Sequence, residues 1–276
     1  MSSIKPLDSH SVHKLCSSQV VVSLGIAIKE LLENSIDAGA KRIEIKLKNY
    51  GCDAVEVIDD GSGIREENFS TLGKKHSTSK ISTFEDLVSV TSFGFRGEAL
   101  NSLCHLADIT IHTRAADAVC GTRLVFDNSG TIKSRHPLAR SRGTTVCLER
   151  LFHTLPVRRR HLTDKMRLMK EFSKAVNLIT AYCLAKVGLQ ISCYRFDAKG
   201  YAFGMIRAFQ KICHRTVLIF YQEPLTCCNC GLQETKRLHL TTDFYLCLHA
   251  FDLSNPGIFW EILPLVSGLR VCPTTM

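Results

Sequence analysis

The feature that most constrains this chain is the run KELLENSIDAGA at residues 29 to 40. On a helix of 3.6 residues per turn, four polar side chains of this run fall in one narrow stripe: Glu30, Glu33, Asn34 and Asp37. Apolar residues cover most of the remaining circumference, and Lys29 is the one cation near the stripe. Because a solvated stripe normally mixes charges of both signs, we expect this one to face a wet pocket. An ordinary amphipathic helix with a solvated face is the alternative interpretation.

Two side chains of the stripe have complementary chemistry. Glu30 and Asn34 are four residues apart, so a helix projects them side by side. A carboxylate can act as a general base, and a carboxamide oxygen suits a hard cation such as Mg2+. The pair is therefore a candidate catalytic base and metal ligand.

Length and composition leave several classes of protein open. The 276 residues, 45% of them hydrophobic, allow one large domain or two modest ones. A net charge of +9 permits a nucleic-acid partner without requiring one. We expect no membrane partner, since no apolar run reaches the length of a membrane span and the N-terminus lacks the pattern of a secretory signal. Many of the 13 cysteines stand singly in apolar patterns, which indicates a reducing, intracellular compartment.

A β-hairpin is predicted after the helix. Residues 42–48 alternate apolar and polar side chains, a turn follows at Asn49-Tyr50-Gly51, and residues 54–58 form the returning strand. The second strand runs into Asp59-Asp60-Gly61-Ser62-Gly63. Carboxylates and glycines at a strand end allow a tight backbone close to a ligand, although a plain acidic turn has the same composition.

Residues 70–97 are rich in Ser, Thr, Lys and Gly, which is typical of a loop over a binding site or of a disordered segment. Hydroxyl and ammonium groups at this density would suit the oxygens of a triphosphate. Gly94 and Gly97 then precede a helix expected to end near Ala107. Backbone N–H groups at such a helix start can hold phosphate, but the spacing alone is a weak signal.

Further strands are predicted at residues 108–113, 121–127, 130–133 and 144–148. The stretch at 155–160 interrupts the pattern and suggests a boundary, after which we expect a helix from Lys165 to about Lys186 and a strand at 189–196. The predicted fold class is α+β: a two-layer sandwich of a mostly antiparallel mixed sheet with helices on one face, followed by a partial second α/β domain. A cysteine cluster at 227–230 fits no standard zinc finger.

Taken in order, these motifs resemble a known family. Residues 4 to 195 are similar to the N-terminal ATPase region of MutL-type DNA mismatch repair proteins, in their PMS branch. This region belongs to the superfamily of gyrases, ninety-kilodalton chaperones, histidine kinases and MutL. The blocks that carry the resemblance are KELLENSIDAGA, EVIDDGSGI, HSTSKI, SFGFRGEAL, GTTV and LFHTLPVRRR.

The resemblance implies a role for each matched residue. Glu30 would be the catalytic base that activates water, and Asn34 would bind Mg2+. Asp59 would accept from the adenine amino group, with Gly63 and Thr145 beside the base. The phosphates would be enclosed by Thr78, Ser79, Lys80, Arg96, Gly97, Glu98, Ala99 and Leu100. At Asp60 the family usually has Asn, and we expect adenine recognition to survive this difference because Asp59 is present.

The resemblance also implies a function in DNA mismatch repair. Binding and hydrolysis of ATP with Mg2+ would switch the conformation of a heterodimer with a MutL-homologue partner. That heterodimer would act in the nucleus, on duplex DNA bound without sequence preference, together with mismatch recognition proteins of the MutS type. By this comparison residues 1–160 form the ATP-binding domain, 161–196 begin a second, transducer-like domain, and 197–276 are a divergent tail.

The chain departs from the family after Arg195. The family continues with a lysine that reaches the γ-phosphate, an Asn-x-Arg segment and a Thr-Pro-Asp-Lys stretch, and the sequence shows none of them there. The PMS endonuclease region has no counterpart either. We therefore expect a C-terminally truncated chain in which ATP hydrolysis is slow.

Two other functions compete with this interpretation. A phosphotransferase of the histidine-kinase class would need a phosphoacceptor histidine on a long dimerising helix, and His10 and His13 lie near a short one. A truncated, non-catalytic module that binds nucleotide, DNA or a partner is favoured by a basic run. Its residues are Arg158, Arg159, Arg160, Lys165, Arg167 and Lys170. That run is the predicted DNA-binding site, centred on the arginine triplet, and a solvated surface explains it equally well.

Overall fold

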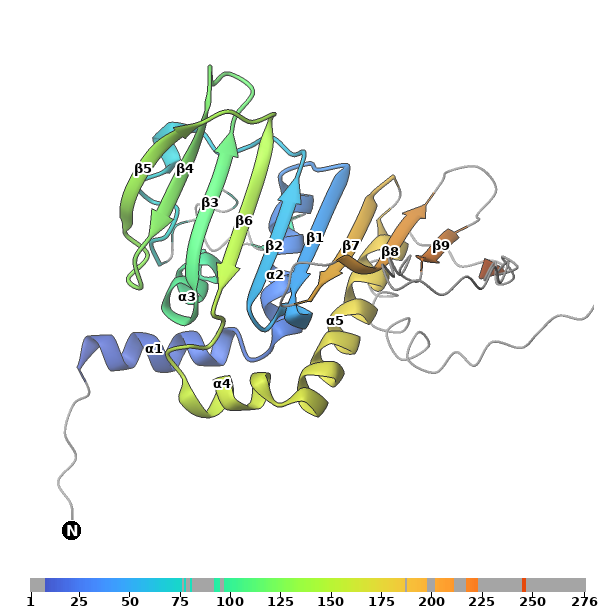
Figure 1. The fold of residues 1–276 in the computed structure, drawn as a ribbon. Coiled ribbons are helices and arrows are strands. Elements are labelled where there is room, and N and C mark those ends of the chain that lie inside the picture. Colours follow the sequence, from blue (N-terminus) through green and yellow to red (C-terminus); the bar gives the residue numbers. More distant parts are fainter. Residues whose placement is uncertain are drawn as a thin grey trace, which may run out of the picture.

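The computed structural model describes residues 8–75, 77, 80, 92–94, 97–186 and 188–197, and the backbone of strands at 202–210, 217–222 and 245–246 (Figure 1). The helices are α1 (Ser9–Val20), α2 (Leu24–Asp37), α3 (Ala99–Leu106), α4 (Pro156–Thr163) and α5 (Lys165–Ala185). The strands are β1 (Arg42–Lys48), β2 (Ala54–Asp59), β3 (Asp108–Arg114), β4 (Gly121–Phe126), β5 (Ile132–Leu138), β6 (Gly143–Glu149), β7 (Gln190–Phe196), β8 (Ala202–Gln210), β9 (Val217–Gln222) and β10 (Tyr245–Leu246).

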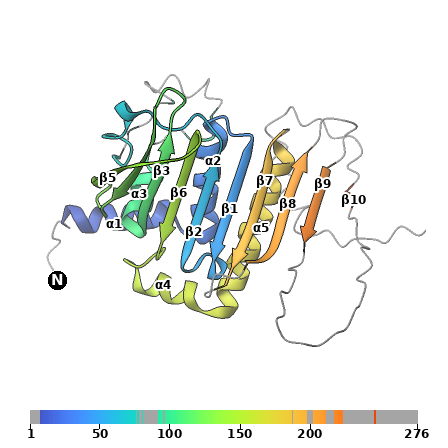
Figure 2. The ribbon, with the colours of Figure 1, turned by 45° about the horizontal axis from the view of Figure 1, so that its top comes forward.

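All of these strands form one sheet, in the order β10-β9-β8-β7-β1-β2-β6-β3-β4-β5. Among the described strands, β1 and β7 pair in parallel, and the other neighbours pair antiparallel. Helices α2, α3 and α5 lie on one face of this sheet (Figures 1 and 2). The predicted fold class, α+β with a mostly antiparallel mixed sheet and helices on one face, is confirmed.

The core lies between α2 and the sheet. Strand β1 buries Ile43, Ile45 and Leu47, and the residues between them are more exposed, because successive side chains of a strand point to opposite faces. Helix α2 buries Leu24, Ile28 and Leu32 against this layer. Burying such side chains contributes roughly 1.5–3 kcal/mol each, so this packing fixes the position of α2 and of its polar stripe.

Helix α1 precedes α2 and ends at Val20. The Ser23 hydroxyl accepts from the N–H of Ile26 over 3.2 Å and caps the start of α2. Within the described residues, no single helix is long and apolar enough to cross a membrane. Residues Val12–Val20 and Leu24–Asp37 pass that test only as a pair bent by 81°.

The stretch at 155–160, expected as a break, instead begins a helix. Pro156 stands at the first helical position of α4, where its missing N–H costs nothing and its fixed φ favours the helix. Asp164 caps α5, which packs against α2, and β7 then joins β1. Strands before and after the boundary predicted at residue 160 therefore belong to one sheet. The division into domains stays a prediction.

Candidate functional site

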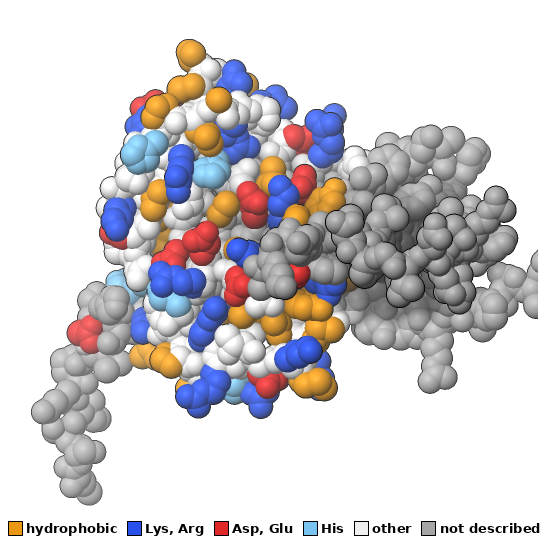
Figure 3. Space-filling view, viewed as in Figure 1, with side chains coloured by type: hydrophobic (Ala, Val, Ile, Leu, Met, Phe, Trp, Pro, Cys, Tyr) orange, Lys and Arg blue, Asp and Glu red, His pale blue; other side chains and the backbone are white. Residues whose placement is uncertain are grey.

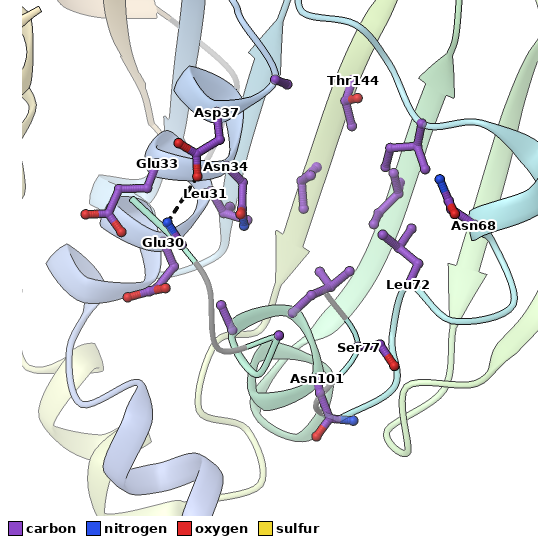
Figure 4. A pocket seen from close by; sticks show the side chains of 18 of the residues that line it. Glu30, Leu31, Glu33, Asn34, Asp37, Asn68, Leu72, Ser77, Asn101 and Thr144 are labelled. Carbon is purple, nitrogen blue, oxygen red and sulfur yellow. Dashed lines mark hydrogen bonds between the residues drawn. The ribbon is translucent and has the colours of Figure 1, made fainter. Parts of the chain in front are cut away.

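A cavity of about 1860 Å³ opens between α2, α3, the segment that follows β2 and strand β6 (Figure 4). Several predicted site residues line it: Glu30, Asn34, Asp59, Gly63, Lys80, Gly97, Glu98, Ala99 and Leu100. The predicted residues Thr78, Ser79 and Arg96 lie outside the described part of the chain. Segments far apart in the sequence therefore meet at one pocket.

The polar stripe of α2 forms one wall of this pocket. Figure 4 shows Glu30, Glu33, Asn34 and Asp37 along the same side of the helix, and all four line the cavity. The prediction that the stripe faces a pocket is confirmed. Hydrophobic packing of the other faces of α2 leaves this side to the solvent-filled space.

Glu33 is buried, unlike Glu30 and Asn34 of the same stripe. Its carboxylate lies 2.7 Å from the ammonium of Lys29 and accepts a hydrogen bond from the Tyr182 hydroxyl of α5. Burial, followed by the hydrogen bond to Glu33, raises the pKa of Tyr182. Lys29 also lies 3.5 Å from Glu30, so one ammonium joins the two carboxylates. The contact from α5 to α2 was not foreseen from the sequence.

Asp59, the last residue of β2, lines the pocket, and its carboxylate accepts from three donors. Oδ1 accepts from the N–H groups of Gly61 at 2.9 Å and Thr144 at 3.1 Å, and Oδ2 accepts from the Ser35 hydroxyl at 3.0 Å. Burial raises the pKa of Asp59, and these hydrogen bonds act in the opposite direction. A carboxylate offers about four acceptor positions, so Oδ2 retains room for one more donor from the pocket.

Asp60 has a structural role of its own. Its carboxylate accepts from the N–H groups of Lys41 at 2.8 Å and Arg42 at 2.9 Å, and from the guanidinium of Arg42 at 2.9 Å. Partial burial opposes ionisation, but the hydrogen bonds from Arg42 and Lys41 prevail and the pKa of Asp60 is lowered. Asp60 does not line the pocket. Asp60, where the family usually has Asn, therefore binds groups at the start of β1 and not the pocket.

The structure corrects the threonine predicted beside the ligand. Thr144 is paired with Asp59 across β6 and β2 and lines the pocket, whereas Thr145 is paired with Ile58 and does not. Directly opposed residues of two strands share a face, and the next residue points to the other side. The Thr145 hydroxyl instead accepts from Arg140 at 3.3 Å on that other face. Thr144, one residue earlier, is the candidate.

Two of the predicted glycines are required by backbone geometry. Gly63 has φ of +73°, and a Cβ there would lie 2.1 Å from the carbonyl oxygen of Arg114. Gly97 has φ of +61°, and a Cβ would lie 2.5 Å from the carbonyl oxygen of Ser77. A side chain at either position would meet backbone that cannot yield, so both turns at the rim of the pocket need glycine.

Asp37 collects donors from two separate segments. The ammonium of Lys80 lies 2.5 Å from Asp37 Oδ2 and 3.2 Å from Asn34 Oδ1. The N–H groups of Phe93 and Gly94 each donate to the same carboxylate over 3.0 Å. The sequence pattern places Asp37 in the stripe but indicates no function for it, because its partners are more than forty residues away.

The basic triplet is divided between structural and exposed side chains. Arg158 donates to the carbonyl oxygens of Ser18 at 2.6 Å and Val21 at 3.1 Å, and Arg159 donates to those of Cys52 and Leu151. Arg160 is exposed. On the face seen in Figure 3, Lys and Arg side chains lie among acidic ones, and several lie at the lower edge, where α4 runs. A role of all three arginines in DNA binding stays a prediction.

Comparison with known proteins gives consistent results. Residues 22–141 match the family described as histidine kinase-, DNA gyrase B-, and HSP90-like ATPase. The mismatch repair endonuclease PMS2 of Homo sapiens is 54% identical over 190 residues, which are 69% of this chain and 22% of that protein. The DNA mismatch repair protein pms1 of Schizosaccharomyces pombe is 46% identical over 195 residues, 70% of this chain and 24% of that protein.

Among solved structures, the crystal structure of the N-terminal domain of a DNA repair protein is 37% identical in sequence, with a TM-score of 0.61. The match covers 69% of this chain and 54% of that one. The chain thus spans about a quarter or less of the length of the two relatives named above. Over 69% of its length, the chain belongs to the MutL-type DNA mismatch repair family, in its PMS branch, and contains that family's ATPase domain.

Proposed function

We propose that this chain binds ATP with Mg2+ in the described pocket and hydrolyses it. The observation that carries the proposal is the arrangement of Asp59, which lines the cavity and whose carboxylate accepts from three donors, with one acceptor position left on Oδ2. Such a fixed acceptor suits the exocyclic amino group of adenine. Thr144 lies opposite Asp59 on the neighbouring strand and would complete that end of the site.

The residues present also fit a magnesium ion. The carboxamide oxygen of Asn34 is exposed in the pocket and already has a cation, the Lys80 ammonium, at 3.2 Å. Oxygen ligands of this kind suit Mg2+, which usually binds through few protein groups together with substrate phosphates. Asn34 would hold the ion, and the bound ion would neutralise charge on the phosphates.

Glu30 is the proposed general base. It lies one helical turn before Asn34 on the same side of α2, so a metal ligand and a base are presented together. The carboxylate is partly exposed to the pocket, where it can accept a proton from a water molecule. Lys80, beside Asn34, and the N–H groups at the start of α3 would contact the phosphates.

The biological function proposed for the chain is DNA mismatch repair in the nucleus. This rests on the PMS-type relatives, and the chain matches only part of their length. We propose that nucleotide binding changes the conformation of a heterodimer with a MutL-homologue partner on duplex DNA. A mismatch recognition protein of the MutS type would direct that heterodimer to its site.

Hydrolysis by this chain should be slow. Phosphoryl transfer needs cationic stabilisation of the γ-phosphate, and after Arg195 we find no stretch that matches the one in which the resemblance places the family's γ-phosphate lysine. Loss of one well-placed electrostatic donor typically costs about a hundredfold to a thousandfold in rate. Single-turnover hydrolysis by this chain, measured beside a longer chain that restores the family's second domain, should show a difference of this size. Equal rates would mean that the missing lysine is not needed.

The proposed activity is tested by substitution of the base. Glu30→Ala should retain ATP binding with Mg2+, and single-turnover hydrolysis should fall to background. Glu44→Ala is a matched control, because Glu44 lies on β1 and does not line the pocket. Binding without any turnover in the unaltered chain would instead support a non-catalytic nucleotide-binding module.

A further inference from the structure

The contacts of Asp37 point to a function for a residue that the proposed activity has not used. Its side chain is 7% exposed, so its charge is largely removed from water. A buried carboxylate needs donors, and Asp37 finds three: the Lys80 ammonium and the N–H groups of Phe93 and Gly94. Residues from both sides of the stretch 81–91 therefore meet on one carboxylate.

The position of Lys80 has a direct consequence for Asn34. The same ammonium that pairs with Asp37 also donates to Asn34 Oδ1, the atom proposed as the metal ligand. A cation held there opposes a metal ion at the same oxygen, because two positive charges in contact with one atom repel each other. Mg2+ and the Lys80 ammonium thus compete for one oxygen, and Asp37 favours the ammonium.

The backbone near Asp37 reinforces this arrangement. Gly94 lies so close to Lys80 that an added Cβ would be 2.9 Å from the Lys80 ammonium. The Ser92 hydroxyl donates to the carbonyl oxygen of Gly94 over 3.1 Å, and the Phe93 ring lies edge-on to Tyr182 at 5.7 Å. The Ser92 bond stabilises the turn at Phe93–Gly94, and the ring contact with Tyr182 joins this turn to α5.

We propose that Asp37 is a positioning residue that holds the Lys80 ammonium against Asn34 when no nucleotide is bound. Binding of Mg2+ with a nucleotide then requires Lys80 to leave Asp37 and to pair with phosphate oxygens. The proposal rests on the proposed function of the pocket. Asp37 acts through Lys80 and need not touch the nucleotide. Its ion pair with Lys80 contributes to the free energy that this exchange requires.

The first test measures the contacts without nucleotide. In the whole chain, Asp37→Asn should accelerate amide hydrogen exchange at Phe93 and Gly94 by about tenfold or more, since an amide group replaces one acceptor oxygen with a donor. Asp108→Asn is a matched control, because Asp108 is also ion-paired but lies at the start of β3, outside the pocket. Unchanged exchange at both residues in the Asp37 variant would overturn the proposal.

The second test measures binding of ADP with Mg2+ by titration calorimetry, which needs no turnover. Asp37→Asn should bind about twofold to tenfold more tightly than the unaltered chain, the range expected for loss of one partly buried ion pair. It should also reach half-saturation at a lower Mg2+ concentration. In a Lys80→Met background the same substitution should change the affinity little, because the coupling passes through Lys80.

The two tests separate this proposal from the function on which it rests. Weaker binding in Asp37→Asn, or an equal effect in both backgrounds, would show that Asp37 acts on the nucleotide or metal directly and would overturn the proposal. If the unaltered chain fails to bind ADP, the proposed function fails. Hydrogen exchange still decides in that case whether Asp37 holds Phe93 and Gly94.

Discussion

The Ser35 hydroxyl donates to Asp59 Oδ2 over 3.0 Å, and this bond joins α2 to β2 beside the pocket that both residues line. It connects the helix that carries the proposed base to the strand that carries the proposed adenine acceptor. Both residues are buried, so neither end of the contact is open to bulk water. The two halves of the site are thus fixed relative to each other before any ligand binds.

The first prediction concerns Asp59 and stability. Burial raises the pKa of Asp59 above the ordinary value of 3.8. Ionised Asp59 therefore destabilises the folded chain, and this destabilisation increases as the pH rises from 3.8 toward the pKa in the folded chain. Asp59→Asn removes this cost and keeps the shape of the side chain. The variant should therefore unfold at a higher urea concentration than the unaltered chain at pH 7. The difference should shrink as the pH falls toward 4, and a lower midpoint at pH 7 would contradict the assigned cause.

The second prediction uses the neighbouring aspartate, where the sign is reversed. The pKa of Asp60 is lowered, so its contribution to stability is present above the ordinary value and is lost as the pH falls through the folded pKa. Asp60→Asn should be slightly less stable than the unaltered chain at pH 7 and should approach it in acid. ADP binding should not change, since Asp60 does not line the pocket. Lost binding in this variant would place Asp60 in the site after all.

The third prediction separates the arginines of α4. Arg158→Ala leaves two backbone carbonyl oxygens without their charged donor and should lower the free energy of unfolding by about 1.5–3 kcal/mol. Arg160→Ala alters an exposed side chain and should change stability by no more than about 0.5 kcal/mol. Urea unfolding of the two variants makes the comparison, and equal losses would contradict the structural role of Arg158.

The same two variants test DNA binding. If Arg160 contacts phosphate, Arg160→Ala should weaken binding to duplexes of any sequence. The slope of log affinity against log salt concentration should become shallower by about 1, the value for one phosphate contact. Arg158→Ala should weaken DNA binding less than Arg160→Ala under conditions where it is folded, because the Arg158 guanidinium already donates to two carbonyl oxygens. Unchanged DNA affinity of the Arg160 variant at low salt would contradict a role of Arg160 in DNA binding.

The fourth prediction concerns the contact between Tyr182 and Glu33. Tyr182→Phe removes the hydroxyl donor from a buried carboxylate and should lower the free energy of unfolding by about 1–3 kcal/mol. Tyr194→Phe, at a half-buried position on β7, is the matched control. If both variants lose a similar amount of unfolding free energy, the contact with Glu33 does not stabilise the fold more than an ordinary tyrosine hydroxyl does.

Local patterns predicted much of the fold. The alternation at 42–48 and 54–58 predicted β1 and β2, because side chains of a strand repeat every two residues. The polar stripe predicted which side of α2 faces the pocket, because a helix repeats every 3.6 residues. Strand β5 was placed too early, at 130–133, since turn residues and an edge strand containing Pro137 gave a weak signal.

What was missed depends on contacts between distant residues. The choice between Thr144 and Thr145 is set by the pairing of β6 with β2, which the sequence of β6 alone does not contain. Arg158 resembles a surface residue until the carbonyl oxygens of α1, some 140 residues earlier, come into contact with it. Asp37 likewise gains its partners only when the chain folds back over α2.

The most direct test of the account is ATP binding with Mg2+ by the unaltered chain, Asp59→Asn and Asp60→Asn, measured side by side by titration calorimetry. We predict that the unaltered chain and the Asp60 variant bind with the same affinity. The Asp59 variant should not bind, because its amide loses the charge-assisted bond to the adenine amino group. All three proteins should be folded at the temperature of the measurement, as circular dichroism can verify. Equal binding by all three, or no binding by the unaltered chain, would contradict the assignment of this pocket to ATP.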